Sequence, residues 1–200
     1  MPKIVDHNER RDHIAEAVTN IVIRDGFDHV TMREIAAEAG YAHGAIARYF
    51  PDKQSILSAT FVRVYTTSNE RILAQVDGVR GLEALNRMCS VLLPFEQKGA
   101  NESRVVLTFW DRASQDPALQ SIHQQHITQR RNLIRRFLTE AAEDGELASH
   151  VNIDVAVNRV SVHNAGWQML AVLMPESADD ASLRASIDSM IDEFRRGDRD

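Results

Sequence analysis

Residues 31–53 read TMREIAAEAGYAHGAIARYFPDK, and this stretch decides the fold that the sequence predicts. Thr31 followed three residues later by Glu34 is a capping box. In such a box the hydroxyl accepts a hydrogen bond from a first-turn amide, and the carboxylate reaches back to the threonine amide. A helix is therefore predicted to begin here. Gly40 stands where a residue with left-handed backbone ends a helix, so this helix is short.

A second short helix is predicted after a turn at residues 40–42, and it runs through residues 43–50 until Pro51 ends it. Small residues leave its exposed side nearly bare, so that a large partner can approach closely; they are Gly44, Ala45 and Ala47. Two helices joined by a glycine-containing turn set the second helix into the major groove of DNA. Arg and His side chains can reach base edges there. The stretch therefore predicts a helix-turn-helix.

The stretch also resembles the N-terminal signature of the tetracycline-repressor (TetR) family. The matching string is T-x-x-x-I-A-x-x-A-G, a small-residue turn, and then G-x-I-x-x-Y-F-x-x-K. The sequence departs from the family in two features. Tyr41-Ala42 stands where members often have a hydroxyl residue, so the usual cap of the second helix is missing. Ala47 stands where many members have Tyr, so a DNA contact made from that position in them is not carried over.

The resemblance and the residue chemistry together predict a set of DNA contacts. Arg33, His43 and Arg48 are expected to contact bases, because Arg pairs bidentately with guanine. Thr31, Tyr49 and Lys53 are expected to hold phosphates. Gly44 and Ala45 complete the predicted DNA-binding set as points of close approach. For Arg10 and Arg11, solvated surface is favoured over a phosphate contact.

The charge balance favours local contact with DNA over general binding. The chain has 23 Lys and Arg residues against 29 Asp and Glu residues, a net charge of −6, which argues against a broadly basic nucleic-acid coat protein. Residues 1–53 have seven basic and nine acidic residues and a net charge of −2. Weak non-specific DNA binding is therefore expected.

The 200 residues suit one large domain or two small ones. A single cysteine, Cys89, excludes an internal disulfide and fits the reducing cytoplasm. No signal peptide and no membrane-spanning stretch is visible, so we expect a cytoplasmic protein that does not enter a membrane.

No window alternates with period two over the length of a strand, so an all-α fold with about nine helices is predicted. The predicted helices cover residues 8–25, 31–39, 43–50, 52–76, 82–97, 102–114, 117–143, 152–174 and 180–195, with residues 99–101 closing the fifth. Residues 1–53 are predicted to form a three-helix helix-turn-helix DNA-binding domain. Residues 54–200 are predicted to form a helical effector-binding and dimerisation domain.

The C-terminal part resembles the betaine-regulator-like branch of the same family, through W-D-R-A-x-x-D-P at 110–117 and the Gly-Glu-Leu turn at 145–147. The resemblance implies a homodimeric, ligand-responsive transcription factor, most often a repressor. Its implied partners are a palindromic double-stranded DNA operator and an unidentified small-molecule effector. The sequence does not identify the effector or the operator.

Members of the family generally keep an effector pocket in the C-terminal half. Plain core is the simpler interpretation of any one large residue there. Together they make a stronger case, because buried indole N–H groups and an imidazole need polar partners that a ligand can supply. The predicted ligand-binding residues are Phe95, Phe109, Trp110, His126, Trp167 and Met169.

The helix at 152–174 has apolar residues nearly all round, more than its own core can cover. The last two helices are therefore predicted to form a four-helix bundle with a second copy of the chain. The candidate anchors of this dimer interface are Trp167, Leu170, Ile187 and Phe194.

Metal binding and catalysis are two other classes of function that the residues could suggest. His123, His126 and His163 suggest metal ligands, but no carboxylate or thiol pattern accompanies them, so no metal site is predicted. No nucleophile elbow, paired-carboxylate motif or nucleotide-binding glycine loop occurs, so we predict no catalytic residue, no cofactor and no enzyme. A helical small-molecule-binding or scaffold protein that has lost DNA binding remains the alternative, supported by the departures at the turn and at Ala47.

Overall fold

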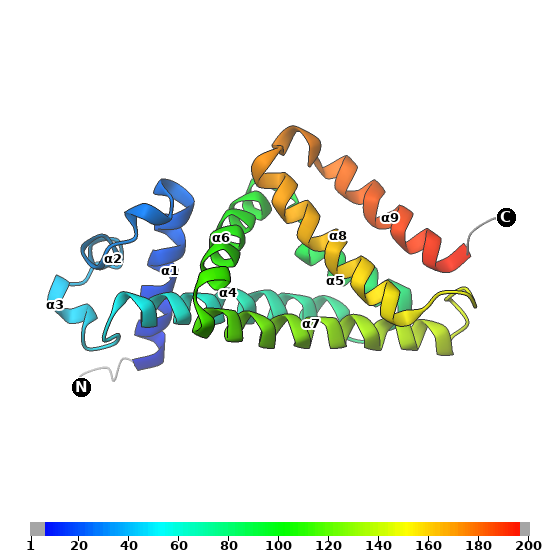
Figure 1. Ribbon diagram of the computed structural model, residues 1–200, viewed down its shortest axis with the longest axis horizontal. Helices are drawn as coiled ribbons and strands as arrows, with labels where there is room; N and C mark the ends of the chain where they lie inside the picture. The colour runs from blue at the N-terminus through cyan, green and yellow to red at the C-terminus, as the bar shows by residue number, and fades with distance from the viewer. Residues whose placement is uncertain (1–6, 197–200) are drawn as a thin grey trace. The chain divides into compact units, whose positions relative to one another are not determined.

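Nine α-helices and two short 3-10 helices make up the described part of the computed structural model, which is residues 7–196 apart from the side chains of His43 and Arg196 (Figure 1). No strand occurs in this range. The α-helices are α1 (His7–Asp25), α2 (Met32–Glu38), α3 (His43–Ile46), α4 (Lys53–Val76), α5 (Gly81–Leu92), α6 (Glu96–Gln115), α7 (Pro117–Glu143), α8 (Ile153–Leu173) and α9 (Asp180–Arg196). The 3-10 helices are η1 (Phe27–His29) and η2 (Pro175–Ser177). The prediction of an all-α fold with about nine helices is confirmed.

The described chain divides into two compact units. Unit 1 consists of residues 7–67 and 104–122, and unit 2 of residues 68–103 and 123–196. Helices α4, α6 and α7 each contribute residues to both units. The functional boundary at residue 53 stays a prediction.

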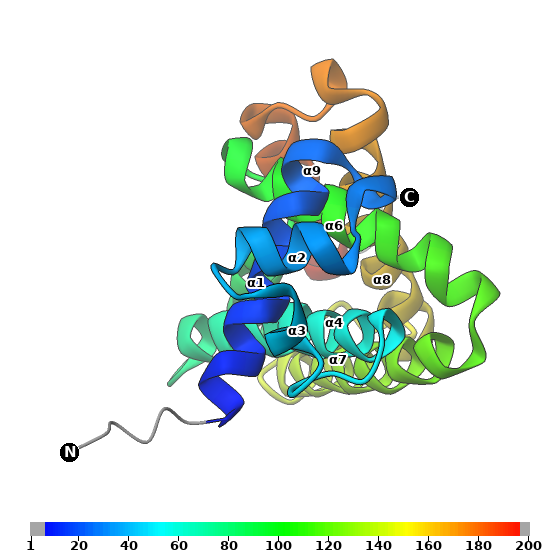
Figure 2. The same cartoon turned by 90° about the vertical axis from the view of Figure 1, so that its left-hand side faces the viewer.

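Unit 1 is built around α1, which α2 crosses; α3 lies next to α2 (Figure 2). Apolar residues at helical spacing meet in one core, and eight of them are at most 1% exposed: Ile14, Val18, Ile21, Val30, Ile35, Ile46, Phe50 and Ile56. Burying one such side chain contributes about 1.5–3 kcal/mol to folding. The helix-turn-helix therefore derives its stability from α1 and α4 as well as from its own short helices.

The two ends of α2 have the predicted local structure. The Thr31 hydroxyl accepts a hydrogen bond from the Glu34 amide at 3.1 Å. Gly40 has a φ of 69°, the left-handed backbone that favours glycine. The Glu34 carboxylate lies 3.7 Å from the Arg33 guanidinium, and among the described residues the Thr31 amide donates no hydrogen bond to it. Of the two hydrogen bonds of a capping box, only the one from the Glu34 amide to the Thr31 hydroxyl is therefore formed.

Helix α3 is shorter than the predicted span of 43–50. It ends at Ile46, and the amides of Arg48 and Tyr49 bond three residues back, to Ala45 and Ile46, at 3.2 and 2.9 Å. Ala42 at its start provides no side-chain cap. So short a helix without a side-chain cap is weakly stabilised, and after Ile46 the chain continues in turns, with the buried Phe50 packed in the core.

Unit 2 is centred on α5, against which α9 packs. Its apolar core residues come from every α-helix of the unit except α6, and include Ile72, Leu82, Leu85, Met88, Phe137, Leu138, Val157, Val160 and Leu183. Cys89 lies in this core, and burial raises the pKa of its thiol to about 12. A thiol that stays protonated is a poor nucleophile, so Cys89 acts as a small apolar core residue.

The boundary between α5 and α6 corrects the sequence prediction. Residues 99–101 were expected to close the fifth helix, but α5 ends at Leu92 and α6 begins at Glu96 and runs through them. A Cβ atom on Gly99 would stand 2.6 Å from the carbonyl carbon of Pro94. Gly99 is therefore required for close approach of the backbone to Pro94, and it does not end a helix.

None of the described helices is both long enough and apolar enough to cross a membrane.

Candidate functional site

Small residues stand on the exposed side of the segment formed by α3 and Ala47. Gly44 and Ala47 are both exposed, and a Cβ atom on Gly44 would meet no other atom within 4 Å. Ile46 is 0% exposed and holds the helix against the core of unit 1. The backbone of α3 can thus come close to a large partner, as reading in a groove requires.

Two exposed arginines belong to the same helix-turn-helix, Arg33 on α2 and Arg48 just after α3. The Arg33 side chain is 85% exposed, with the Glu34 carboxylate at 3.7 Å. Arg48 is exposed, and its guanidinium makes no hydrogen bond or ion pair within the described residues. Exposed Thr31 uses its hydroxyl oxygen to accept the Glu34 amide bond, so its hydroxyl hydrogen remains available to a phosphate. The side chain of His43 lies outside the described part of the chain.

Tyr49 is positioned by the N-terminal part of α1. The Arg10 guanidinium donates a hydrogen bond to the Tyr49 hydroxyl at 3.1 Å, and Arg11 donates to the Tyr49 carbonyl at 2.5 Å. Because the phenol oxygen accepts from Arg10, its hydrogen is left to be donated to another acceptor. The interpretation of Arg10 and Arg11 as solvated surface is therefore wrong.

Ring contacts reinforce the same arrangement. The Arg10 guanidinium carbon lies 5.9 Å from the ring centroid of Tyr41 and 6.0 Å from that of Tyr49, and that of Arg11 lies 4.1 Å from the Phe50 centroid. Cation–π contacts of this kind contribute about 0.5–1 kcal/mol at exposed sites. We call Arg10, Arg11, Tyr41 and Tyr49 the arginine–tyrosine cluster. No local sequence rule connects residues 38 and 39 positions apart, so sequence reasoning did not find it.

Lys53 begins α4, and Asp52 caps that helix by accepting a hydrogen bond from the Ser55 amide at 2.7 Å. The Lys53 ammonium lies 4.9 Å from the centroid of the Phe27 ring, and the Arg112 guanidinium carbon lies 4.4 Å from the same centroid. Burial lowers the pKa of Lys53, with a further contribution from the charge of Arg112. The structure thus places two cations next to each other at the start of α4.

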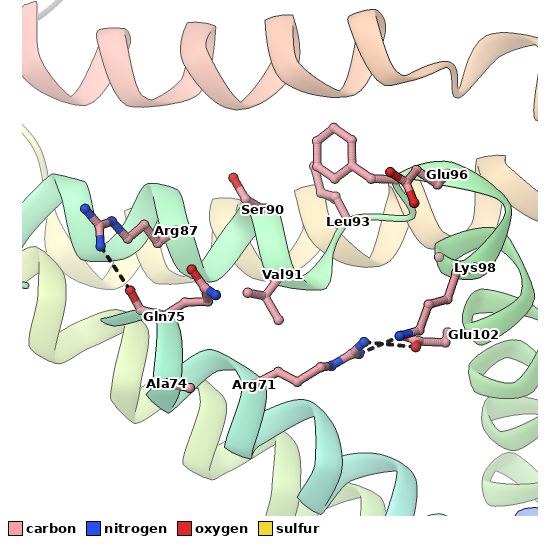
Figure 3. Close-up of a pocket in the computed structure, with 12 residues that line it drawn as sticks. Arg71, Ala74, Gln75, Arg87, Ser90, Val91, Leu93, Glu96, Lys98 and Glu102 are labelled. Atoms are coloured by element: carbon pink, nitrogen blue, oxygen red, sulfur yellow. Dashed lines mark hydrogen bonds and ion pairs between the residues drawn. The ribbon is translucent and has the colours of Figure 1, made fainter. Parts of the chain in front are cut away.

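A pocket of about 480 Å³ lies within unit 2, a volume in the range of small-molecule sites (Figure 3). Its lining comes from the end of α4, from α5 and from residues 93–102. The charged lining residues are Arg71, Arg87, Glu96, Lys98 and Glu102, and the apolar ones include Ala74, Val91, Leu93 and Phe95. The Arg71 guanidinium binds the Glu102 carboxylate through two hydrogen bonds of 2.9 and 2.6 Å.

Two family models match the chain. Residues 14–60 match the bacterial regulatory proteins of the tetR family, and residues 81–196 match the C-terminal region of BetI-type transcriptional repressors. The second match alone covers more than half of the chain. This protein belongs to the TetR family.

Known members of the family agree with this assignment. The TetR-family protein is 28% identical over 180 residues to the transcriptional regulator PksA of Bacillus subtilis, covering 88% of this chain and 84% of that one. It is 29% identical over 147 residues to the regulator BetI of Burkholderia lata, covering 68% of this chain and 72% of that one. It is thus a helix-turn-helix transcription regulator with a BetI-type C-terminal region, and not an enzyme. The predicted family and branch are confirmed.

Solved structures show the same fold. A transcriptional regulator from Rhodococcus sp. Rha1 aligns with a TM-score of 0.83 at 20% identity, over 94% of this chain and 96% of that one. A regulator from Saccharomonospora viridis, crystallised in complex with choline, aligns with a TM-score of 0.85 at 20% identity, over 92% and 96% of the two chains.

The residues predicted to bind the effector do not gather at the pocket of unit 2. Phe95 lines it. Phe109 is buried in unit 1, where it contacts Phe61 and Tyr65, and Trp110 also belongs to unit 1. The others belong to unit 2, where His126 and Trp167 are half-buried and Met169 is exposed.

The Trp167 indole has protein partners. Its N–H donates to the Ser186 hydroxyl at 2.9 Å and lies 3.2 Å from the His163 imidazole. A ligand is therefore not needed to satisfy it. The charged lining residues Arg71, Lys98 and Glu102 were not among the predicted ligand-binding residues, because a charged residue on a helix is most simply interpreted as solvated surface.

The predicted dimer anchors fall into two groups. Ile187 and Phe194 are 2% and 3% exposed in the core of their own protomer, which disfavours them as contacts to a second copy. Trp167 and Leu170 are half-buried. Four other apolar residues of α8 are exposed by 45–71%: Val155, Val162, Met169 and Leu173. Their spacing of seven, seven and four residues puts them on one face of the helix.

The histidines weighed as metal ligands have other surroundings. His163 lies 2.7 Å from the Ser186 hydroxyl and 3.3 Å from the Asn164 side-chain oxygen. His123 and His126 lie on α7, and burial lowers the pKa of both. Within the described residues, no three His, Cys, Asp or Glu side chains are grouped as a metal ion would require.

Proposed function

We propose that this TetR-family protein is a homodimeric repressor that binds a palindromic operator and is released from it by a small-molecule effector. The observation that carries the proposal is the exposed pair of small residues Gly44 and Ala47 at α3, in a helix-turn-helix that also exposes Arg33 and Arg48. Such a surface suits docking into the major groove. Because its proposed target is chromosomal DNA, the protein acts in the cytoplasm.

The protein makes two kinds of contact with DNA, one to base edges and one to phosphates. Arg33, His43 and Arg48 read base edges, while Gly44 and Ala45 allow the backbone to approach. Thr31, Tyr49 and Lys53 hold phosphates and set the register of the reading helix. The arginine–tyrosine cluster supports this division, because it holds the Tyr49 hydroxyl beside a cation where a phosphate would be attracted.

The exposed apolar stripe of α8 forms the dimer interface, with Trp167 and Leu170 at its edge. Helices α8 and α9 of two protomers build a four-helix bundle. A two-fold dimer reads a palindrome, and its half-sites lie one helical turn of DNA, about 34–36 Å, or a multiple of that apart.

The pocket of unit 2 is the effector site. Arg71 and Ala74 on its wall belong to α4, the same continuous helix that begins at Lys53, so an effector that shifts α4 changes the DNA contact made there. The choline complex of the Saccharomonospora viridis protein supports a small molecule as the effector of this fold. The expected coupling is about 1–3 kcal/mol, or 5–150-fold in operator affinity, and DNA must weaken effector binding by the same factor.

Selection of bound DNA from a random pool, with the full chain, tests the proposal. A palindromic consensus is the expected result. A single half-site would contradict the dimeric mode of reading. A pool without any enriched sequence would overturn operator binding and favour a small-molecule-binding protein that has lost this activity.

A further inference from the structure

The pocket of unit 2 has an excess of positive charge at one end. Arg71 and Glu102 neutralise each other through their two hydrogen bonds. The Lys98 ammonium points toward this pair in Figure 3, and no carboxylate lies within 4 Å of it among the described residues. Arg71, Lys98 and Glu102 thus contribute two cations and one anion to the lining of this pocket, and the exposed Lys98 has no ion-pair partner among the described residues.

The other charged lining residues do not cancel this excess. Arg87 is paired with Glu83 at 2.7 Å. The Glu96 carboxylate is drawn at the upper rim of the pocket, apart from the Arg71–Glu102 pair (Figure 3). The Nε atom of Arg71 is buried and has no hydrogen-bond partner. A buried donor without an acceptor is costly, so this end of the pocket favours a ligand that brings an acceptor with negative charge.

The rest of the pocket suits a hydrocarbon group. Ala74, Val91, Leu93 and Phe95 line it, and Leu93 is 4% exposed. Sites for small molecules combine such an apolar wall with a few polar groups that fix orientation. From this pairing we infer that the effector is an amphipathic carboxylate, with its carboxylate between Arg71 and Lys98 and its hydrocarbon part on the apolar wall. This inference rests on the proposed effector site.

A cationic ligand fits the same pocket poorly. Recognition of a quaternary ammonium group uses the open faces of aromatic rings. Phe95 is the aromatic residue that lines the pocket, and the Arg184 guanidinium carbon already lies 5.0 Å from its ring centroid. The uncompensated Lys98 would also repel a cation. The pocket therefore selects against ligands of the choline class.

Binding of a carboxylate also bears on α4. Arg71 is on α4 and Glu102 is on α6, so their ion pair ties the two helices together within unit 2. A ligand carboxylate competes with Glu102 for the same guanidinium. Weakening of the Arg71–Glu102 ion pair is the step by which the ligand acts on α4.

Titration calorimetry of the full chain without DNA tests the ligand class, using two probes of equal chain length and opposite charge. Octanoate is expected to bind saturably at neutral pH, and octyltrimethylammonium at least about tenfold more weakly. Lys98→Gln should weaken octanoate binding by about tenfold or more, the size expected for a hydrogen bond to a charged group. Lys98→Arg should keep most of the affinity.

Two further variants exclude trivial explanations. Arg104→Gln removes the same charge from the same helix at a residue outside the pocket lining, and it should leave octanoate binding unchanged. Glu102→Gln should strengthen octanoate binding, because it removes the competitor for Arg71. A merely structural role of Glu102 would produce the opposite sign.

Three results would overturn the inference: octyltrimethylammonium binding as tightly as octanoate, no saturable binding of octanoate, or equal affinities of Lys98→Gln and the unmodified protein for octanoate. Since no DNA is present, failure here leaves the operator selection unaffected. Failure of that selection likewise leaves the calorimetric result standing.

Discussion

At the residue scale, Tyr49 shows how one side chain depends on a distant part of the chain. Its ring, hydroxyl and carbonyl are all held by residues of α1: His7 lies 5.0 Å from the ring centroid, and Arg10 and Arg11 donate to the two oxygens. Fixing a side chain before binding reduces the entropy lost on binding. Arg10 is therefore a positioning residue for the phosphate contact proposed for Tyr49.

The first prediction concerns this pair. Tyr49→Phe should weaken binding to operator and to unrelated duplex by the same amount, about 0.5–1.5 kcal/mol for one lost hydrogen bond. Arg10→Ala should weaken both more, and the double variant should lose less than the sum because the two residues act together. Fluorescence anisotropy with both duplexes measures this. Arg24→Ala, an exposed arginine of the same helix, is the matched control. A Tyr49→Phe variant that loses affinity only for the operator would contradict a phosphate contact.

The second prediction separates base reading from phosphate binding. Arg48→Ala should cost ~1–3 kcal/mol and relax the preference at one base position, since its exposed guanidinium is free to pair with guanine. Lys53→Ala should weaken binding to all sequences alike and lower the salt slope by about one unit per half-site. Binding of a set of single-base operator variants at several salt concentrations distinguishes the two. Equal effects on every sequence would show that the division of roles is wrong.

At the scale of the helices, two glycines differ in the space around them: Gly99 has no room for a side chain, and Gly44 has. Gly99 approaches the Pro94 backbone so closely that a Cβ atom would stand 2.6 Å away, whereas a Cβ atom on Gly44 meets nothing within 4 Å. Gly99 serves folding of the α5–α6 connection. Gly44 is free of such a demand inside the protein, so its small size agrees with the close approach to DNA proposed for it.

The third prediction follows from this contrast. Gly99→Ala should lower the free energy of unfolding by about 1–3 kcal/mol, the usual cost of overpacking. Gly44→Ala should raise that free energy by about 0.4–1 kcal/mol, because alanine restricts the unfolded chain. It should nevertheless weaken operator binding. Urea denaturation measures the first two effects and anisotropy the third. Loss of stability in Gly44→Ala would indicate an internal contact of α3 instead.

The contact of α8 with α9 leads to the fourth prediction. Burial lowers the pKa of His163, with a smaller contribution from the charge of Arg159, while bonds to Asn164 and Ser186 act in the opposite direction. Below about pH 6.5 the unfolded chain therefore binds more protons than the folded chain at this residue. The stability contributed by neutral His163 is complete above that pH and is lost as the pH falls toward the lowered folded pKa.

Denaturation at a series of pH values between about 7.5 and 5 checks this dependence around the unperturbed pKa of histidine. The protein should lose stability on acidification, and His163→Gln should flatten the curve. His123 and His126 have pKa values lowered in the same direction, so part of the slope should remain. A slope that is unchanged in His163→Gln would exclude this imidazole as a contributor.

At the scale of the whole molecule, the proposed dimer depends on the face of α8 that its own protomer leaves uncovered. The helix has apolar residues nearly all round, and one side packs into unit 2 through Ala156, Val157 and Val160. Its other side exposes Val155, Val162, Met169 and Leu173. An exposed apolar stripe of this kind marks an interaction surface.

The fifth prediction tests that surface. Val162→Glu should turn the dimer into a monomer without loss of the monomer fold, because Val162 is 71% exposed in the protomer. Sedimentation at micromolar concentration gives the mass, and circular dichroism checks the fold. Val62→Glu, an exposed valine of α4, is the control and should stay dimeric. An unmodified chain that sediments as a monomer would contradict the proposed interface outright.

The sequence alone determined the features that depend on neighbouring residues. Helix caps at Thr31 and Asp52, the left-handed Gly40 and apolar spacing in the helices are local, so they could be predicted from a few adjacent positions. The all-α fold and the helix-turn-helix follow from them. The family resemblance also rests on one short stretch with fixed spacing.

Only the tertiary structure decided which distant side chains meet. Arg10 with Tyr49 are 39 residues apart, and Arg71 with Glu102 are 31 apart. Periodicity shows that a helix has an apolar face but not which apolar residues a neighbour covers, so the burial of Ile187 and the exposure of Val162 were not predictable. Contacts of this kind depend on how helices cross and in which register they pack, and those are set by the whole chain folding together.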